Sequence, residues 1–165
     1  MIVVVMGIAG CGKTHVGRAL AAALGWPFHD ADDFHLPESI ASMRAGVPLT
    51  DADREPWLQR LRALLLQVDA SGQNAVLACS ALRRNFRERL RENIADVRFV
   101  FLQADRGVLA QRLRDRQGHF MPASLLESQL ETLEQPDDAL PLDAASPADM
   151  LVAQIRTWLD TTPLH

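Results

Sequence analysis

The chain has 165 residues, a formal net charge of −4 and 48% hydrophobic residues, which are ordinary values for a globular domain. The acidic balance argues against a general nucleic-acid or membrane partner, and the apolar run MIVVVMG is too short to span a bilayer. Two cysteines do not make a disulfide framework, which indicates a cytoplasmic location. Together, these features predict a single cytoplasmic domain with no nucleic-acid or membrane partner.

The first half of the chain alternates predicted strands with predicted helices. Residues 2–6 form an unbroken apolar run rich in valine, which is typical of a strand buried on both faces. The expected elements are, in order, a strand at 2–6, a helix at 13–24, a strand at 27–30, a helix at 37–45 and a helix at 56–70 capped by Thr50 or Asp51.

The second half continues the alternation, with strands at 75–79, 97–102 and 139–142 and helices at 82–93, 106–117, 123–133 and 147–159. Ser80 is the expected cap of the first of these helices. Ser146 is the expected cap of the last, with Pro147 at its first helical position. This order predicts one doubly wound α/β domain, with a parallel sheet and with ligands at the carboxyl ends of the strands.

A glycine-rich segment, G-I-A-G-C-G-K-T, separates the first expected strand from the first expected helix. It fits the phosphate-loop pattern G-x-x-x-x-G-K-[ST] in the required strand–loop–helix context, which disfavours an accidental glycine-rich turn. Of the 17 basic residues only Lys13 is a lysine, and it stands at the position that the pattern demands. The predicted ATP-binding residues are Gly7, Ile8, Ala9, Gly10, Cys11, Gly12, Lys13 and Thr14.

The chemistry of phosphate binding explains this spacing. Glycines let successive backbone N–H groups turn toward phosphate oxygens, and the helix N-terminus adds its dipole. Lys13 is expected to reach the β- and γ-phosphates, and the Thr14 hydroxyl is expected to bind Mg²⁺. Cys11 has two interpretations: a small side chain that the loop tolerates, or a redox-sensitive thiol at a helix N-terminus.

The stretch HDADDFH, at 29–35, follows the second expected strand and therefore opens onto the same sheet edge as the phosphate loop. Asp30 is expected to hold Mg²⁺ through water, and Asp32 to orient or deprotonate an attacking hydroxyl. We expect the two carboxylates to stand in extended chain and to have separate roles. A zinc site is disfavoured because no cysteine lies nearby, and a solvated acidic loop is the remaining alternative.

Four blocks of sequence resemble one known family. They are the phosphate loop, DADDFHLPESIASMRAGVPLTDADREPWL, ACSALRRNFR and RLRDRQGHFMPASLLESQLETLEQP. In this order and spacing they resemble bacterial gluconokinases of the short P-loop type, which are similar in fold to shikimate and adenylate kinases. Ala31 and Leu36 depart from the usual pattern of that family.

The resemblance implies ATP- and Mg²⁺-dependent phosphorylation of D-gluconate at its 6-hydroxyl. It also implies a five-stranded parallel sheet, a mobile helical lid at about 106–136 and a homodimer. Competing functions are another small-molecule kinase of this fold, for shikimate or a nucleotide, and a nucleotide-dependent switch. The chain lacks the N-K-x-D element of GTPase switches.

Gluconate carries a carboxylate and several hydroxyls, which its site must recognise. Arg54 and Arg83 are the favoured carboxylate partners because a planar guanidinium matches a carboxylate, and His35 is expected to bond a hydroxyl. Each of the three is otherwise an ordinary surface arginine or satisfied histidine. Trp57 is expected to be a packing residue.

The segment before Gly118 supplies the expected lid arginines. Arg112 and Arg116 lie four residues apart on one helix face and resemble the arginines that close over phosphates in this family. A solvated face is the alternative, particularly for Arg106 and Arg114. His119 is expected to contact gluconate or to order the lid. By analogy with the fold, adenine is expected at the loop 143–147.

Overall fold

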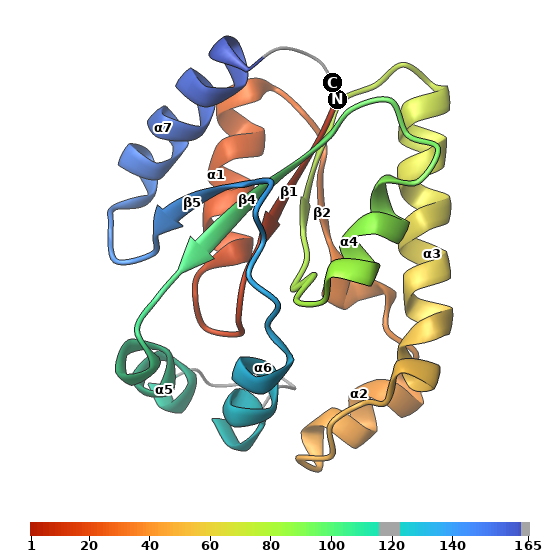
Figure 1. Cartoon of the computed structure of the whole chain (residues 1–165), viewed down its shortest axis with the longest axis vertical. Coiled ribbons are helices and arrows are strands. Elements are labelled where there is room, and N and C mark those ends of the chain that lie inside the picture. Colours follow the sequence, from red (N-terminus) through yellow and green to blue (C-terminus); the bar gives the residue numbers. More distant parts are fainter. Residues whose placement is uncertain (116–122, 163–165) are drawn as a thin grey trace.

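The structure, a computed structural model, describes residues 1–115 and 123–162 of the chain. Five parallel strands form one sheet in the order β2-β3-β1-β4-β5, which confirms the predicted doubly wound α/β fold (Figure 1). The strands are β1 (Ile2–Met6), β2 (Phe28–Asp30), β3 (Ala75–Ala78), β4 (Val97–Gln103) and β5 (Ala139–Asp143).

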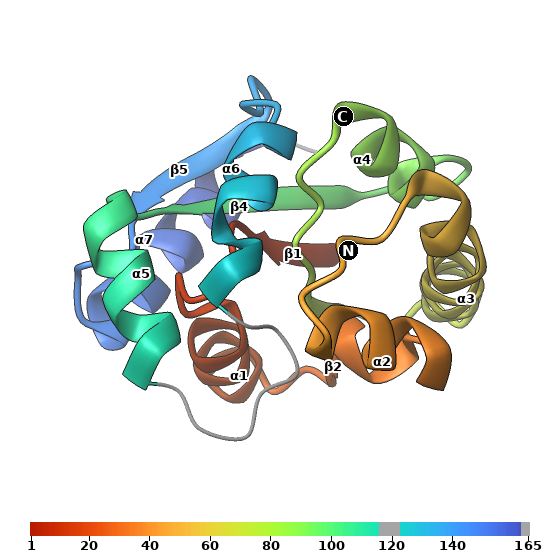
Figure 2. The same ribbon diagram turned by 90° about the horizontal axis from the view of Figure 1, so that it is seen from below.

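Helices cover both faces of the sheet, as Figures 1 and 2 show. Val3 and Val5 of β1 pack toward α1 and α7, whereas Val4 and Met6 pack toward α3 and α4. This division follows from the two-residue repeat of a strand, and it explains why β1 is apolar throughout. The helices are α1 (Lys13–Leu24), α2 (Pro37–Arg44), α3 (Asp51–Ala70), α4 (Arg84–Arg91), α5 (Arg106–Asp115), α6 (Leu126–Thr132) and α7 (Ala148–Thr161). In the described part of the chain, none of them has the length and apolarity of a membrane span.

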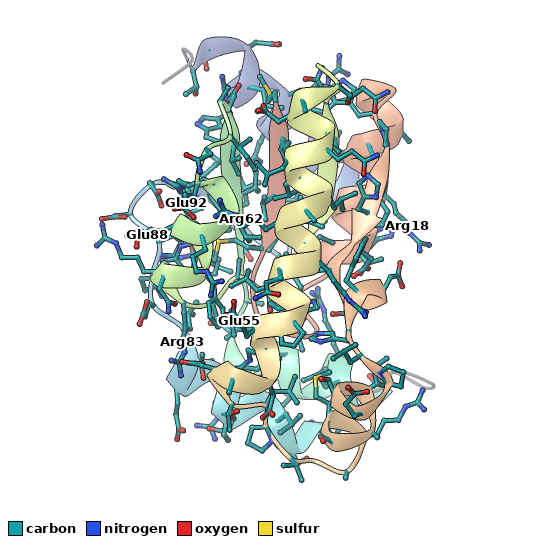
Figure 3. The ribbon with its side chains drawn as sticks, turned by 90° about the vertical axis from the view of Figure 1, so that its right-hand side faces the viewer. Arg18, Glu55, Arg62, Arg83, Glu88 and Glu92 are labelled. Atoms are coloured by element: carbon teal, nitrogen blue, oxygen red, sulfur yellow. The ribbon has the colours of Figure 1, made fainter. Side chains whose placement is uncertain are left out.

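Ion pairs hold the two helices of one face together. Glu55 of α3 accepts two hydrogen bonds from Arg89 of α4, both at 2.6 Å, and these bonds lower the pKa of Glu55 to about 2. Arg62 and Glu92 form a second pair between α3 and the end of α4, and Figure 3 shows the side chains along this face. The pairs fix α4, and therefore the loop before it, relative to α3.

The start of α3 differs from the prediction. The helix begins at Asp51 rather than at Pro56, because Thr50 and Asp53 form a reciprocal capping box. The Thr50 backbone N–H donates to the Asp53 carboxylate at 2.8 Å, and the Asp53 N–H donates to the Thr50 hydroxyl at 3.2 Å. The expected cap at Thr50 is confirmed, and the proline lies inside the helix instead of opening it.

Ser80 does not cap α4, so that prediction is wrong. Ala81 has a φ of 44°, a left-handed conformation that turns the chain and delays the helix to Arg84. The first-turn N–H of Arg84 donates instead to the carboxylate of Glu134, which lies 50 residues further along the chain. The cap of α4 is therefore a tertiary contact.

Two other expectations need correction. Pro147, rather than Ser146, occupies the cap position of α7 and has no side-chain cap bond. The helix expected at 123–133 is divided into a 3-10 turn, η2 (Ala123–Leu125), and the shorter helix α6. The helix expected at 106–117 is described to Asp115, and its last residues lie outside the described part of the chain.

The acidic stretch after β2 is not extended as predicted. Ala31–Phe34 form a 3-10 turn, η1, and the Asp30 carboxylate accepts the backbone N–H of Asp32 at 3.1 Å. Aspartate favours such local bonds to its own backbone. Asp30 and Asp32 are therefore connected by a turn and not by extended chain.

Candidate active site

The phosphate loop connects β1 to α1 as predicted. Gly7 has a φ of 143°, and a Cβ atom there would lie 2.6 Å from the carbonyl oxygen of Leu102 on β4. Gly12 opens α1 with a φ of 101°. Glycine is required at both positions, by contact at the first and by backbone conformation at the second. The loop therefore turns tightly at the carboxyl end of the sheet, where backbone N–H groups meet a helix N-terminus.

Two polar side chains follow the last glycine of the loop. The Lys13 ammonium donates to the carbonyl of Ile8 at 3.2 Å and so lies across the loop. The Thr14 hydroxyl donates to Asp30 Oδ2 at 2.8 Å, which brings the end of β2 next to the start of α1. A hydroxyl oxygen and a carboxylate beside a phosphate loop are the ligand types that Mg²⁺ prefers when phosphates supply its other ligands.

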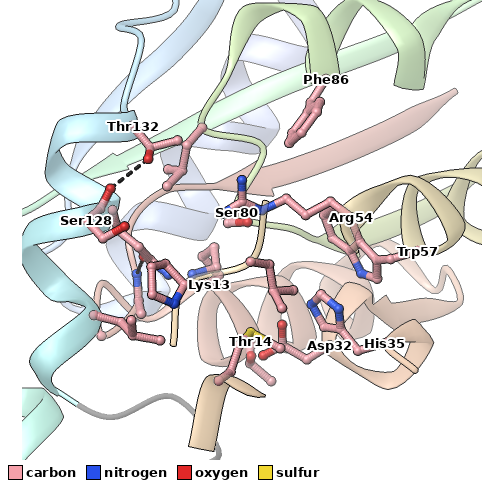
Figure 4. A pocket seen from close by; sticks show the side chains of 18 of the residues that line it. Lys13, Thr14, Asp32, His35, Arg54, Trp57, Ser80, Phe86, Ser128 and Thr132 are labelled. Carbon is pink, nitrogen blue, oxygen red and sulfur yellow. Dashed lines mark hydrogen bonds between the residues drawn. The ribbon is translucent and has the colours of Figure 1, made fainter. Parts of the chain in front are cut away.

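A pocket of about 470 Å³ opens beside this loop, and Figure 4 shows many of its side chains. It brings together residues that are far apart in the sequence, from Ala9 to Thr132. Its lining comprises Ala9, Gly10, Gly12, Lys13, Thr14, His15, Arg18, Asp32, His35, Met43, Pro48, Leu49, Arg54, Trp57, Ser80, Leu82, Arg83, Phe86, Arg112, Leu125, Ser128, Gln129 and Thr132. Its volume falls in the range of ordinary small-molecule sites.

One side of the pocket carries the acidic turn and an aromatic stack. Asp32 and His35 line the pocket, whereas Asp33 is exposed and is not part of the lining. The rings of His35 and Trp57 stack at 4.9 Å with an angle of 4° between their planes. Trp57 Nε1 donates to the Ala31 carbonyl at 2.7 Å. The tryptophan is buried as expected, and it also fixes η1 and the orientation of His35.

The environment of His35 lowers its pKa from 6.5. Burial is the main cause, the neighbouring Asp32 opposes it, and the cation of Arg54 adds to it. His35 is therefore neutral in the folded protein at neutral pH. Neutral imidazole has one N–H donor and one acceptor nitrogen, which suits contacts with hydroxyl groups.

This lowered pKa predicts weaker folding in mild acid. Below about pH 6.5 the unfolded chain binds a proton at His35 that the folded chain does not. The free energy of unfolding therefore decreases as the pH is lowered from about 6.5 toward the native pKa of His35. Between pH 5 and 7.5, the thermal unfolding temperature of His35→Gln should change less with pH than that of the parent. Burial also lowers the pKa of His29, so His29→Gln should reduce the dependence of stability on pH as well, and the double variant should show the weakest dependence. If His35→Gln and the parent showed the same dependence of unfolding temperature on pH, the lowered pKa of His35 would be contradicted.

The two predicted carboxylate-binding arginines both line the pocket and share one acidic partner. Asp51 accepts from Arg83 at 2.7 Å and from Arg54 at 3.3 Å, so one carboxylate holds both side chains. Burial lowers the pKa of Arg54, and the Asp51 carboxylate acts in the opposite direction. The arrangement presents two adjacent cations to the pocket, which suits an anionic group on a ligand.

The loop that carries Ser80, Leu82 and Arg83 is held from behind by a buried cation. The Arg87 side chain is only 3% exposed, and its Nη1 donates to the carbonyls of Ala81 and Leu82 at 3.0 and 3.1 Å. These bonds satisfy carbonyl groups that the left-handed turn at Ala81 leaves without a helix or strand partner. Arg87 therefore maintains the shape of this wall of the pocket.

A second hollow, of about 340 Å³, lies on the other side of the phosphate loop, between Gly10–Gly12 and the loop after β5. Arg112 of α5 borders both hollows, and it donates to the Ala144 carbonyl at 3.1 Å. Ala144 and Ser146 line this hollow, in the loop where adenine was expected. Cys11 lines it too, but its residue is only 2% exposed and packs in the core, which favours the interpretation as a small packing residue.

The remaining residues of the expected lid fall into two groups. Arg106 and Arg114 have exposed partners, Glu127 and Gln111, and belong to the solvated face that was the alternative for them. Arg116, Gly118 and His119 lie outside the described residues.

Several polar lining residues were missed as site candidates, among them Ser80, Arg18 and Gln129. Ser80 was interpreted as a helix cap, although its position at the carboxyl end of β3 is a sufficient signal for a pocket residue. Arg18 lies one turn beyond Thr14 on α1 and follows from helical periodicity. Gln129 has no comparable signal, because it reaches the phosphate loop only through the tertiary fold.

A parallel sheet with a phosphate loop after its first strand, and a polar pocket beside that loop, is the architecture of a P-loop kinase acting on a small molecule. Comparison with known proteins agrees with this class. The sequence profile of the shikimate kinase family matches residues 9–145. The gluconokinase of Gluconobacter oxydans is 50% identical over 139 residues, which cover 84% of this chain and 78% of that protein.

Solved structures agree. A sugar kinase from Janibacter superposes with a TM-score of 0.90 at 45% identity, covering 98% of this chain and 95% of that one. A gluconokinase from Sinorhizobium meliloti superposes with a TM-score of 0.80 at 42% identity and covers 97% of each chain. The protein is thus a phosphotransferase with an alcohol group as acceptor, and it belongs to the gluconokinases within the shikimate kinase family.

Proposed function

We propose that the protein transfers the γ-phosphoryl group of ATP to the 6-hydroxyl of D-gluconate, giving 6-phospho-D-gluconate and ADP. The observation that carries this proposal is that a phosphate loop, the Asp32 carboxylate and the cations of Arg54 and Arg83 line one pocket. Phosphoryl transfer from ATP needs the phosphate loop, and a hydroxyl acceptor needs a proton acceptor such as Asp32. The carboxylate of an aldonate needs cations such as the two arginines.

The nucleotide is proposed to run along the phosphate loop from one hollow to the other. Adenine occupies the hollow beside Ala144, and the loop residues 7–14 bind the phosphates through their backbone N–H groups. Lys13 and Arg112 then supply positive charge to the terminal phosphates. Both border the larger pocket, where charge spreads over the transferred group in the transition state.

Mg²⁺ is the proposed metal, with the Thr14 hydroxyl as its direct ligand and Asp30 holding its water shell. Support comes from the 2.8 Å contact between these two groups, which places their oxygens side by side next to the loop. When bound, the ion neutralises charge on the β- and γ-phosphates. The homodimer and the cytoplasmic location implied by the family resemblance stay predictions, as do the roles of Arg116 and His119.

On the acceptor side, Asp32 is proposed to accept the proton of the 6-hydroxyl as its oxygen attacks the γ-phosphorus. The bond between that phosphorus and the β–γ bridging oxygen breaks, and ADP leaves with the electron pair. Arg54 and Arg83 bind the carboxylate at the opposite end of the acceptor, and His35 bonds a hydroxyl between them. The neutral state and stacked orientation of His35 support this role.

A coupled ADP-release assay across acceptors tests the proposal. D-Gluconate is expected to give the highest kcat/KM among gluconate, other aldonates, shikimate and nucleoside monophosphates. D-Sorbitol is the matched control, since it keeps the hydroxyls but lacks the carboxylate. Losing the charge-assisted bonds to the two arginines is expected to lower its kcat/KM by at least roughly 100-fold. Shikimate or a nucleotide surpassing gluconate, or sorbitol equalling it, would overturn the proposal.

A further inference from the structure

Gln129 of α6 makes a side-chain contact with the phosphate loop across 120 positions of sequence. Its Oε1 accepts the backbone N–H of Ala9 at 2.8 Å. Backbone N–H groups of a phosphate loop are the donors that bind phosphate oxygens. The Gln129 carbonyl oxygen therefore lies where a phosphate oxygen is expected.

The position of Ala9 indicates which phosphate is concerned. Ala9 lines the larger pocket, together with Asp32 and Arg54, and does not line the hollow beside Ala144. Gly10 and Gly12 line both and so mark the passage from one to the other. A nucleotide that runs from the smaller hollow to the larger one brings its terminal phosphate to Ala9. On this path the Gln129 amide, which contacts the Ala9 N–H and lines the larger pocket, borders the position of the terminal phosphate.

The helix that carries Gln129 is anchored to the acceptor side of the pocket. Ser128 and Thr132, on the same helix, also line that pocket, as Figure 4 shows. Two residues after the helix, the Glu134 backbone N–H donates to the Leu82 carbonyl at 2.9 Å, and its carboxylate accepts the N–H of Arg84. Gln129 is thereby fixed relative to the loop that carries Arg83.

We propose that Gln129 is a catalytic residue that contacts the transferred γ-phosphoryl group; this inference rests on the proposed function. A phosphate oxygen is a stronger acceptor than an amide oxygen and takes the Ala9 N–H when the triphosphate binds. The Gln129 amide, which carries two N–H donors as well as its oxygen, then donates to the phosphoryl oxygens as charge spreads over them. A neutral amide suits this position because a carboxylate would repel the phosphate.

Two measurements on Gln129→Ala test the proposal. Its kcat with gluconate is expected to fall by roughly 10²-fold, the usual effect of removing one transition-state donor. Its affinity for ADP, measured by calorimetric titration, is expected to stay near that of the parent because ADP lacks the γ-phosphate. Gln111→Ala, which removes an exposed glutamine from α5, is the matched control and should keep both values.

Gln129→Glu separates contact with the γ-phosphate from a structural role. Its carboxylate is nearly the same size, and its charge is expected to weaken a non-hydrolysable ATP analogue by at least about 10-fold more than ADP. Equal losses for both nucleotides, or turnover of Gln129→Ala equal to that of the Gln111→Ala control, would overturn the proposal. If the parent does not phosphorylate gluconate, the proposed function fails, and the comparison of ADP with the analogue still decides the role of Gln129.

Discussion

Lys13→Ala is expected to lower kcat by roughly 10²- to 10³-fold or more, because positioning and electrostatic stabilisation supply most of the catalysis in phosphoryl transfer. Lys13 is the only lysine of the chain, it lines the larger pocket, and its ammonium contacts the carbonyl of Ile8. Lys13→Arg is expected to fail as well, because a planar guanidinium does not replace a compact ammonium within the tight loop. The coupled ADP-release assay gives the measurement.

The thermal stability of the two Lys13 variants is the control for this prediction. Within the described part of the chain, the Lys13 side chain donates a single hydrogen bond, to a backbone carbonyl, so the thermal unfolding temperature of both variants should stay close to that of the parent. Near-normal turnover in either folded variant would mean that the loop does not bind phosphate as proposed.

Asp32→Asn is expected to lower kcat by roughly 10²- to 10⁴-fold, the usual contribution of a general base, with ATP affinity nearly unchanged. The substitution keeps the shape of the side chain in the pocket and removes only its ability to accept a proton. Initial rates at saturating gluconate, together with titration of an ATP analogue, separate the effect on chemistry from an effect on binding.

The neighbouring aspartates provide matched controls. Asp30→Asn should instead raise the Mg²⁺ concentration needed for half-maximal rate, because Asp30 contacts Thr14 rather than the acceptor pocket. Asp33→Asn should be tolerated best, since Asp33 is exposed and does not line the pocket. Turnover that suffers more from Asp33→Asn than from Asp32→Asn would show that the wrong carboxylate is assigned.

Sequence by itself determined those features whose cause is local. The apolar run of β1 predicts a strand buried on both faces, and the structure buries alternate residues against different helix pairs. The phosphate loop is equally local in its pattern, and Gly12 adopts a left-handed conformation that its own backbone allows. Because the strands are parallel, their carboxyl ends place that loop and the Asp30–Asp32 turn at the same edge of the sheet.

Local patterns failed where the hydrogen-bond partner of a backbone N–H group decides the conformation. Ser80 has the chemistry of a helix cap, but the left-handed turn at Ala81 and the carboxylate of Glu134 move the start of α4 to Arg84. Sequence proximity also suggested extended chain through Asp30 and Asp32, although a hydrogen bond between them closes a 3-10 turn. In each case a side chain satisfied a backbone N–H in a way that residue type alone does not specify.

Only the tertiary structure decided how the candidate site is assembled. Arg54 and Arg83 were each expected to bind a carboxylate, yet nothing in the sequence predicts that Asp51 holds them together. The contact of Gln129 with Ala9 spans 120 residues and depends on where α6 docks over the phosphate loop. Such contacts arise from packing between elements and not from periodicity or spacing within one, so they become visible only when the chain is folded.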